Sequence, residues 1–364
     1  MQPEGNHISF NSRYSKARYN FLTTASESAT LIKSWQHPLR GIAGEKLYLD
    51  LAWFGSLTAP KVLLTISGTH GVEGYCGSGI QVGLIKTGWH LQADDDVAIV
   101  IIHGLNPYGM SHLRRVNEDG VDLNRNFIDF AQPLPENTVY DDLAEVIIPE
   151  QWTESIQTAT LAQIINYLHE NSSGTEAIAR GQYHYWYAPF YGGEAPTWSN
   201  RTFNQIVDRY LLDKQAIGLL DYHTGLGQYA TGQLMSLDRQ ANSNQNLAAE
   251  VWGDKLVVAG SHQSVAPYSP QGTLIAALQN KLNQSICIAA VYEFGTIPET
   301  EVFQALRADH WLQAHGDLSS KQALEIKQNM LYAFYCDRSD WRKSVCNLAF
   351  VAQEELLAGL RSLI

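Results

Sequence analysis

The chain has 364 residues, 45% of them hydrophobic, which is enough to bury a sizeable core in one large domain or two ordinary ones. Its formal net charge of -12, spread without a block of like charges, argues against a nucleic-acid surface or an anionic membrane as the partner. A small molecule or a peptide is the expected partner, and composition does not bear on the oligomeric state.

Residues 1–20 lack the apolar centre of a signal peptide, and no segment of the sequence approaches the roughly eighteen uninterrupted apolar residues of a membrane helix. The four cysteines form no CxxC pair and no dense framework, so reduced thiols are expected in place of disulfides. These features predict an unexported, cytoplasmic protein.

Apolar runs that end near glycines predict the strands of an α/β fold. Val, Ile and Leu dominate five such runs, which we interpret as buried strands: residues 47–54, 62–67, 97–103, 217–223 and 286–294. Helical patterns lie between them, for example at 161–169 and 244–252. This alternation predicts a sheet whose crossover helices cover both faces.

The sequence shows no internal repeat or flexible linker, so one domain spanning residues 1–364 is the simplest account, with a core at about 45–320. Residues 130–180 contain an acidic, proline-marked stretch and are interpreted as a partly helical insertion. Apolar residues recur at helical spacing between 341 and 360, which predicts that the tail at about 320–364 ends in an amphipathic helix packed on the body.

Polar residues with catalytic potential end several of the predicted strands. His70 and Glu73 follow the strand at 62–67, and three further strands end at His103, His223 and Glu293. Because open α/β sheets bind ligands at the carboxyl ends of their strands, these side chains are expected to converge if their strands are neighbours.

Two histidines and one carboxylate, with a fourth position left to water, form a ligand set used by catalytic zinc. His70 and Glu73 lie in the glycine-rich stretch SGTHGVEGYCGSG and would supply two ligands from one loop. His103 and His223 compete for the third place. His223 is favoured because DYHTGLG has a similar glycine-rich exit, whereas His103 is interpreted as a core histidine.

The segment RRVNEDGVDLNRNF at 114–127 concentrates charged and amide side chains in a region with few apolar anchors. Exposed salt bridges would explain such a run. The functional alternative is that its arginines recognise a carboxylate or a developing oxyanion, while Asp122 orients a metal-bound imidazole. Both interpretations are open at this point.

Six sequence features occur together in the order found in one known superfamily: HGVE at 70–73, NPYG at 106–109, RVN and GVDLNRNF at 115–127, the strand-end His223, and VYEFGT at 291–296. Over roughly residues 60–300 the chain resembles the zinc carboxypeptidase superfamily, in a bacterial-type branch of the carboxypeptidase A-like metallopeptidases. The resemblance implies a three-layer α/β/α sandwich around a mixed, twisted central sheet of about eight strands.

The resemblance also implies roles for individual residues. His70, Glu73 and His223 would bind one zinc ion, Glu293 would act as general acid/base, and Arg115 would polarise the scissile carbonyl. The neighbouring Arg114 competes with Arg115, since only the following Val-Asn distinguishes the two.

The resemblance further implies that Asn124 and Arg125 hold a substrate carboxylate and that Asp122 is the partner of His70. Tyr268 in APYSPQGT is a counterpart of the mobile tyrosine used by family members, although a role as a plain loop aromatic fits it equally.

The predicted function is that of a zinc-dependent metallopeptidase. It would perform carboxypeptidase-type hydrolysis of a peptide or related amide that bears a free carboxylate, by metal-activated water with Glu293 as acid and base. The nearest alternative is a zinc-dependent deacylase or amidohydrolase of small N-acyl amino acids. Less favoured are an inactive binding protein and a nucleotide-dependent oxidoreductase, for which GLGQYA at 225–230 resembles a dinucleotide fingerprint.

Overall fold

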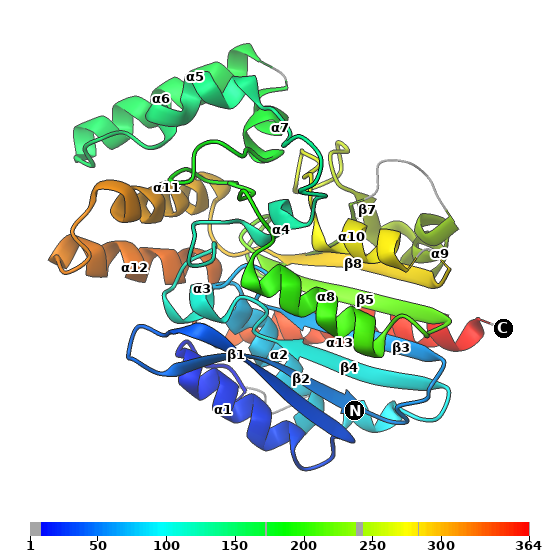
Figure 1. Ribbon diagram of the computed structural model, residues 1–364. Helices are drawn as coiled ribbons and strands as arrows, with labels where there is room; N and C mark the ends of the chain where they lie inside the picture. The colour runs from blue at the N-terminus through cyan, green and yellow to red at the C-terminus, as the bar shows by residue number, and fades with distance from the viewer. Residues whose placement is uncertain (1–8, 172, 238–242, 283, 364) are drawn as a thin grey trace.

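The computed structural model describes residues 9–171, 173–237, 243–282 and 284–363, and within them an eight-stranded mixed sheet runs through the molecule (Figure 1). The order of the strands across the sheet is β1-β2-β4-β3-β5-β8-β6-β7. Their bounds are β1 Leu31–Arg40, β2 Lys46–Phe54, β3 Lys61–Ser67, β4 Val97–His103, β5 Ala216–Thr224, β6 Gly232–Ser236, β7 Leu256–Val258 and β8 Ile286–Phe294.

The four central strands, β4, β3, β5 and β8, are parallel to one another, while β2 and β6 pair antiparallel at either side of them. Both faces of these central strands are covered, and every residue of β3, β4 and β5 is buried. Burial on both faces explains why they appear in the sequence as continuous apolar runs. All five predicted strands are confirmed to within one residue at each end.

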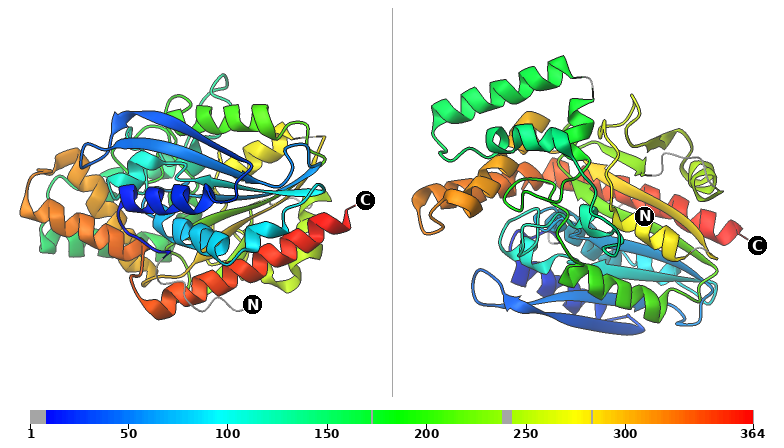
Figure 2. Two further views of the ribbon diagram at one scale, coloured as in Figure 1. Left: turned by 90° about the horizontal axis from the view of Figure 1, so that it is seen from below. Right: turned by 45° about the horizontal axis from the view of Figure 1, so that its top comes forward.

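Helices cover both faces of the sheet, which confirms the predicted three-layer sandwich (Figure 2). One face carries α1 (Tyr14–Ala25), α2 (Gly74–Lys86), α9 (Ser243–Trp252) and α13 (Ser339–Ser362). The other face carries α4 (Leu123–Asn126), α8 (Trp198–Tyr210) and α10 (Leu274–Lys281). The C-terminal helix was expected from its spacing, and its apolar stripe packs into the first of these two cores.

The predicted insertion at 130–180 is helical in part, as expected, and contributes α5 (Thr138–Ile147), α6 (Glu154–Glu170) and α7 (Gly174–Ala179). These helices share an apolar cluster with α11 (Glu299–His315) and α12 (Lys321–Phe334). Figure 1 shows this group beside the sheet rather than on its faces. The remaining short helices are α3 (Pro107–Ser111), η2 (Trp89–Gln92) and η3 (Gly253–Lys255).

Across the part of the chain that the structure describes, no helix is both long and apolar enough to span a bilayer. All four cysteines are buried and reduced, as the sequence predicted. The N-terminal segment that lacks a signal core lies partly outside the described residues, which begin at residue 9.

A buried ion cluster ties α11 to α12 and to the loop that follows α3. The carboxylate of Asp309 on α11 accepts hydrogen bonds from Arg114 Nε at 3.0 Å and from Lys327 Nζ on α12. Burial alone would raise the pKa of Asp309, but the charges of Lys327 and Arg114 outweigh it and lower that pKa to about 2. The ionised form is therefore strongly favoured in the folded protein.

We predict that Asp309→Asn lowers the free energy of unfolding at pH 7 by about 3 kcal/mol, because it leaves two buried cations without an anion. Since the folded pKa lies below the ordinary aspartate value of 3.8, the stabilisation is complete above that value and is lost as the pH falls towards about 2. Urea unfolding at a series of pH values should show the variant and the wild type converging in acid.

The matched control is Asp340→Asn, which removes a carboxylate that pairs with Arg338 on the surface. An exposed pair contributes little, so this variant should keep wild-type stability at every pH. Equal effects of the two substitutions would contradict the role assigned to the buried cluster.

Candidate metal centre

The loop between β3 and α2 carries His70 and Glu73 and is held by backbone contacts that require glycine. Gly68 has a φ of +77°, and a Cβ at Gly71 would lie 2.1 Å from the carbonyl carbon of Gly109. The close approach lets Gly71 N–H and Val72 N–H donate to the carbonyls of Arg115 and Arg114. The loop is thereby fixed against the segment that contributes the arginines.

The other two predicted residues arrive on adjacent parallel strands. His223 near the end of β5 is the register partner of Glu293 near the end of β8. Both side chains lie on the same face of the sheet, because paired residues of neighbouring strands point the same way. β3 lies on the other side of β5, so the loop that follows it reaches the same edge of the sheet.

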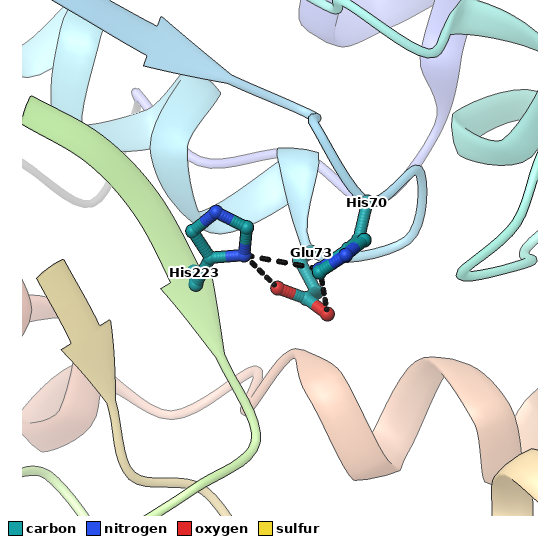
Figure 3. Close-up of side chains that lie close together, drawn as sticks. All are labelled: His70, Glu73 and His223. Carbon is teal, nitrogen blue, oxygen red and sulfur yellow. Dashed lines mark hydrogen bonds and ion pairs between the residues drawn. The ribbon is translucent and has the colours of Figure 1, made fainter. Parts of the chain in front are cut away.

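Figure 3 shows the side chains of His70, Glu73 and His223 pointing toward one another. The Nδ1 atoms of the two histidines are 3.0 Å apart. The Glu73 carboxylate lies 3.0 Å from His70 Nδ1 through Oε1 and 3.1 Å from His223 Nδ1 through Oε2. All three residues are buried, and together they form a group able to hold a metal ion.

The outer nitrogen of each imidazole faces a carboxylate. His70 Nε2 is 2.9 Å from Asp122 Oδ1, and His223 Nε2 is 2.8 Å from Asp221 Oδ2. An ionised carboxylate only accepts hydrogen bonds, so each Nε2 carries the proton and donates it. The Nδ1 atoms of both rings then face each other and Glu73, an arrangement that a cation between them would stabilise.

The charged neighbours of the cluster shift the pKa values of Glu73 and His223. Burial would raise the pKa of Glu73, but the charges of His70 and Arg115 and the hydrogen bond from His223 hold it below its usual range. Burial would lower the pKa of His223, but Asp221 and Glu73 raise it well above the usual value. The carboxylates around these rings thus favour positive charge at this point, whether a proton or a metal ion supplies it.

The two adjacent arginines have different partners in the structure. Arg115 borders the cluster: its Nη1 donates to Glu73 Oε1 at 2.6 Å, and its Nε and Nη2 donate to Asp122 Oδ2 at 3.3 Å. Arg114 turns away to the buried Asp309. Arg115 is therefore the arginine of the site. Asp122, Asn124 and Arg125 are all buried, so the interpretation of this segment as exposed salt bridges is wrong.

Arg125 is a buried guanidinium bound to backbone carbonyls. Its Nε and Nη2 donate to the carbonyl oxygen of Ala179 at 3.2 and 2.6 Å, and its Nη1 donates to that of Asn124 at 2.9 Å. The nearby carboxylate of Asp122 pairs with His70 and Arg115 instead. The Asn124 side chain instead accepts from Leu274 N–H at 3.0 Å, which fixes the loop between the two arginines.

Glu293 lies beside the cluster with one oxygen held by the backbone, since Leu226 N–H donates to Oε1 at 3.1 Å. Burial raises the pKa of Glu293 to about 8, and the charge of Glu73 adds to this effect. Tyr268 is half-buried, and burial raises the pKa of its hydroxyl against the effect of Arg125 and Arg115. Both side chains line the cavity onto which the cluster opens.

That cavity has a volume of about 340 Å³, and its lining includes the polar residues of the site: His70, Arg115, Asn124, Arg125, His223, Tyr268 and Glu293. Helices α6 and α7 of the insertion contribute to its wall, as does Phe190 from the aromatic stretch at 181–193. The sequence indicated no link between the insertion and the site.

His103 lies away from the cluster. Its ring stacks on Phe21 of α1 with 4.5 Å between centroids, and its Nε2 is 2.9 Å from Ser78 Oγ. Burial lowers the pKa of His103 to about 4, as expected for a neutral core histidine. GLGQYA at 225–230 leads into strand β6 rather than a helix, so the dinucleotide fingerprint has no helix N-terminus for a pyrophosphate.

Sequence reasoning missed Asp221, whose carboxylate orients His223 and accepts a hydrogen bond from Thr69 Oγ1 at 2.8 Å. A signal was present, because residues two apart on a strand point to the same face. The sequence Asp-Tyr-His at the end of a predicted strand therefore places a carboxylate beside the histidine.

The sequence matches one protein-family model. The model of the family described as "Protein of unknown function (DUF2817)" matches residues 10–347. The chain belongs to this family. No curated protein matches the sequence.

Solved structures with a similar fold include two of thrombin-activatable fibrinolysis inhibitor, each 10% identical in sequence. The bovine protein, in a complex with tick carboxypeptidase inhibitor, matches with a TM-score of 0.51 over 98% of this chain and 99% of its own. The second matches with a TM-score of 0.55 over 99% of this chain and 77% of its own. The fold is that of the zinc carboxypeptidases, as the sequence resemblance predicted.

We predict that His223→Ala purified with zinc offered retains less than about a tenth of the wild-type zinc, because a site of two ligands holds zinc far more weakly than one of three. The metal content of the purified protein, measured by mass spectrometry, tests this directly. His315→Ala is the control, since His315 is an exposed histidine on α11 and should leave the content unchanged. Full zinc content in the His223 variant would rule out the assigned ligand set.

Proposed function

We propose that this protein is a zinc-dependent hydrolase that cleaves an amide bond in a substrate bearing a free carboxylate, in the manner of a carboxypeptidase. The observation that carries the proposal is the convergence of His70, Glu73 and His223 on one point in a cavity that also holds Glu293 and Arg115. These groups correspond to ligands, base and electrophile of metal-assisted hydrolysis.

In this proposal His70, Glu73 and His223 hold the metal, and Asp122 and Asp221 keep the protons on the outer nitrogens of the two rings. When bound, zinc supplies a Lewis acid for the amide carbonyl and lowers the pKa of a coordinated water to about 7. The protein's contribution is a rigid set of ligands: Thr224 N–H donates to Glu73 Oε2 at 3.1 Å and further restrains that carboxylate.

Glu293 takes the proton of the attacking water and passes it to the leaving amine. Its burial makes the carboxylate a stronger base than an exposed glutamate, because its pKa of about 8 lies far above the ordinary value. The hydrogen bond from Leu226 N–H fixes one oxygen and so sets the direction in which the other accepts the proton.

Arg115 stabilises the oxyanion that forms on the carbonyl. Of the five N–H donors of its guanidinium, three are engaged by Glu73 and Asp122, which leaves two for a substrate oxygen. The two carboxylates fix the orientation of the guanidinium before the substrate arrives, which is the condition for effective electrostatic stabilisation.

Arg125 and Asn124 would recognise the substrate's carboxylate. Arg125 is a buried cation whose described partners are backbone carbonyls, and an anionic ligand would complete its pairing. A planar guanidinium binds a carboxylate through two parallel hydrogen bonds, so it favours a substrate with a free carboxylate over one with an amide.

We predict that Glu293→Gln lowers kcat by at least about 10³-fold while zinc content stays at the wild-type level, because the amide cannot accept the proton of water. The measurement is turnover of any amide substrate that the wild type cleaves, together with metal analysis. Glu301→Gln, an exposed position in the first turn of α11, is the control and should keep full activity. Undiminished turnover in the Glu293 variant would remove this residue from the mechanism.

We also predict that Arg125→Lys lowers kcat/KM by about 10²-fold for substrates with a free terminal carboxylate, mainly through KM, because a lysine cannot form the bidentate pair. The same substrates with an amidated terminus provide the internal control. They should be poor for the wild type and no poorer for the variant. A variant that still prefers the free acid as strongly as the wild type would show that another group binds the carboxylate.

A further inference from the structure

The wall of the cavity is far more apolar than a metal site requires. Helix α6 faces it with Leu161, Ile164, Ile165 and Leu168. These residues follow the spacing i, i+3, i+4 and i+7, which places them on one stripe of the helix. A stripe of this kind normally packs against the protein core.

Much of this stripe is not packed against protein. Ile164 is the only buried residue of the 17 in α6, whereas Leu161, Ile165 and Leu168 are half-buried. Apolar side-chain area that stays in contact with water is unfavourable, so these half-buried residues indicate a surface that a ligand covers. Because these residues line the same cavity as Glu293, the substrate itself is the ligand that reaches them.

Helix α11 forms part of the same lining with Val302, Phe303 and Leu306. Its side chains and those of α6 meet in one apolar cluster that includes Ile164, Leu168 and Phe303. The insertion and α11 thus form a continuous apolar wall, here called the α6–α11 wall. It consists of Leu161, Ile164, Ile165 and Leu168 of α6 and of Val302, Phe303 and Leu306 of α11.

The chemistry of the α6–α11 wall distinguishes an alkyl chain from a peptide. Its seven side chains contain only carbon atoms beyond the backbone, and the backbone groups within a helix bond to one another. A peptide lying there would lose the hydration of its amides without gaining partners, which is unfavourable for each buried amide. An alkyl chain has no such groups and gains from every methylene that it buries.

We propose that the substrate is an N-acyl amino acid with a long alkyl chain, whose carboxylate binds at Arg125 and whose chain lies along the α6–α11 wall. This inference rests on the proposed function, since it assigns the substrate class of the same amide-cleaving site. It selects long-chain acyl amino acids over peptides and over acetylated ones.

The test uses the zinc-loaded full-length protein and four N-acyl glycines with acetyl, butanoyl, octanoyl and dodecanoyl chains. The value of kcat/KM should rise by up to about fourfold for each added methylene until the wall is covered. An apolar tripeptide ending in glycine, similar in length to octanoylglycine, should be the poorer substrate. A flat series, or a preference for the tripeptide, would overturn the inference.

Two variants locate the effect. Ile165→Ser should flatten the chain-length series, and Leu161→Trp should fill the cavity and move the optimum to shorter chains. Leu324→Ser removes a leucine that is 64% exposed on α12, outside the cavity, and is the matched control. A wild-type series in both cavity variants would show that the chain does not lie along this wall.

Binding separates failure of the inference from failure of the proposed function. Isothermal titration of the metal-free protein should show dodecanoylglycine binding at least about 10²-fold more tightly than acetylglycine. Equal affinities would overturn the inference even if all four compounds were hydrolysed. Tight binding of the long-chain compound with no turnover of any amide by the zinc-loaded protein would instead overturn the proposed function.

Discussion

The polar residues of the candidate site depend on the buried carboxylate of Glu73, which contacts three of them. One oxygen contacts Arg115 and His70, and the other contacts His223 and the amide of Thr224. A carboxylate buried this deeply would be unfavourable alone, and each of these partners offsets part of its desolvation. Glu73 therefore joins the loop after β3, the end of β5 and the arginine segment into one unit.

The parallel register of the sheet provides the frame for this unit. With β5 between β3 and β8, His70 and Glu73 from the loop after β3 meet His223 of β5, and Glu293 from β8 is the register partner of His223. Parallel strands bring all their carboxyl ends to one edge, so a short list of strand-end residues becomes a site without long-range loops. In the described part of the chain, the outer strands contribute no residue to the group of His70, Glu73 and His223.

The central strands could be predicted because strands that are buried on both faces have continuous apolar sequences. The edge strand β1 has mostly half-buried or exposed residues and a proline, so its sequence does not differ from that of a loop. β6 and β7 have five and three residues, too few for a periodic signal. Their positions are set by pairing with β8 and with each other, which is tertiary information.

The residues of the candidate site also differ in whether the sequence alone could predict them. Motif order indicated the three candidate ligands and Glu293, and the structure brings these side chains together. The choice between Arg114 and Arg115 depended on a partner 195 residues away, Asp309, which no local pattern could reveal. The α6–α11 wall was equally inaccessible, since a stripe of leucines and isoleucines on a helix has the same spacing whether it faces a core or a cavity.

Helix α11 contacts the arginine segment and also lines the cavity. Through Asp309 it holds Arg114, whose carbonyl accepts from Val72 N–H in the ligand loop, and Arg114 is bonded directly to Arg115. Through Leu306, within one turn of Asp309, it contributes to the apolar wall. A shift of α11 caused by an ill-fitting ligand would therefore also displace the arginine segment. Under the proposed function, a ligand that fits the α6–α11 wall would leave Arg115 in place for catalysis.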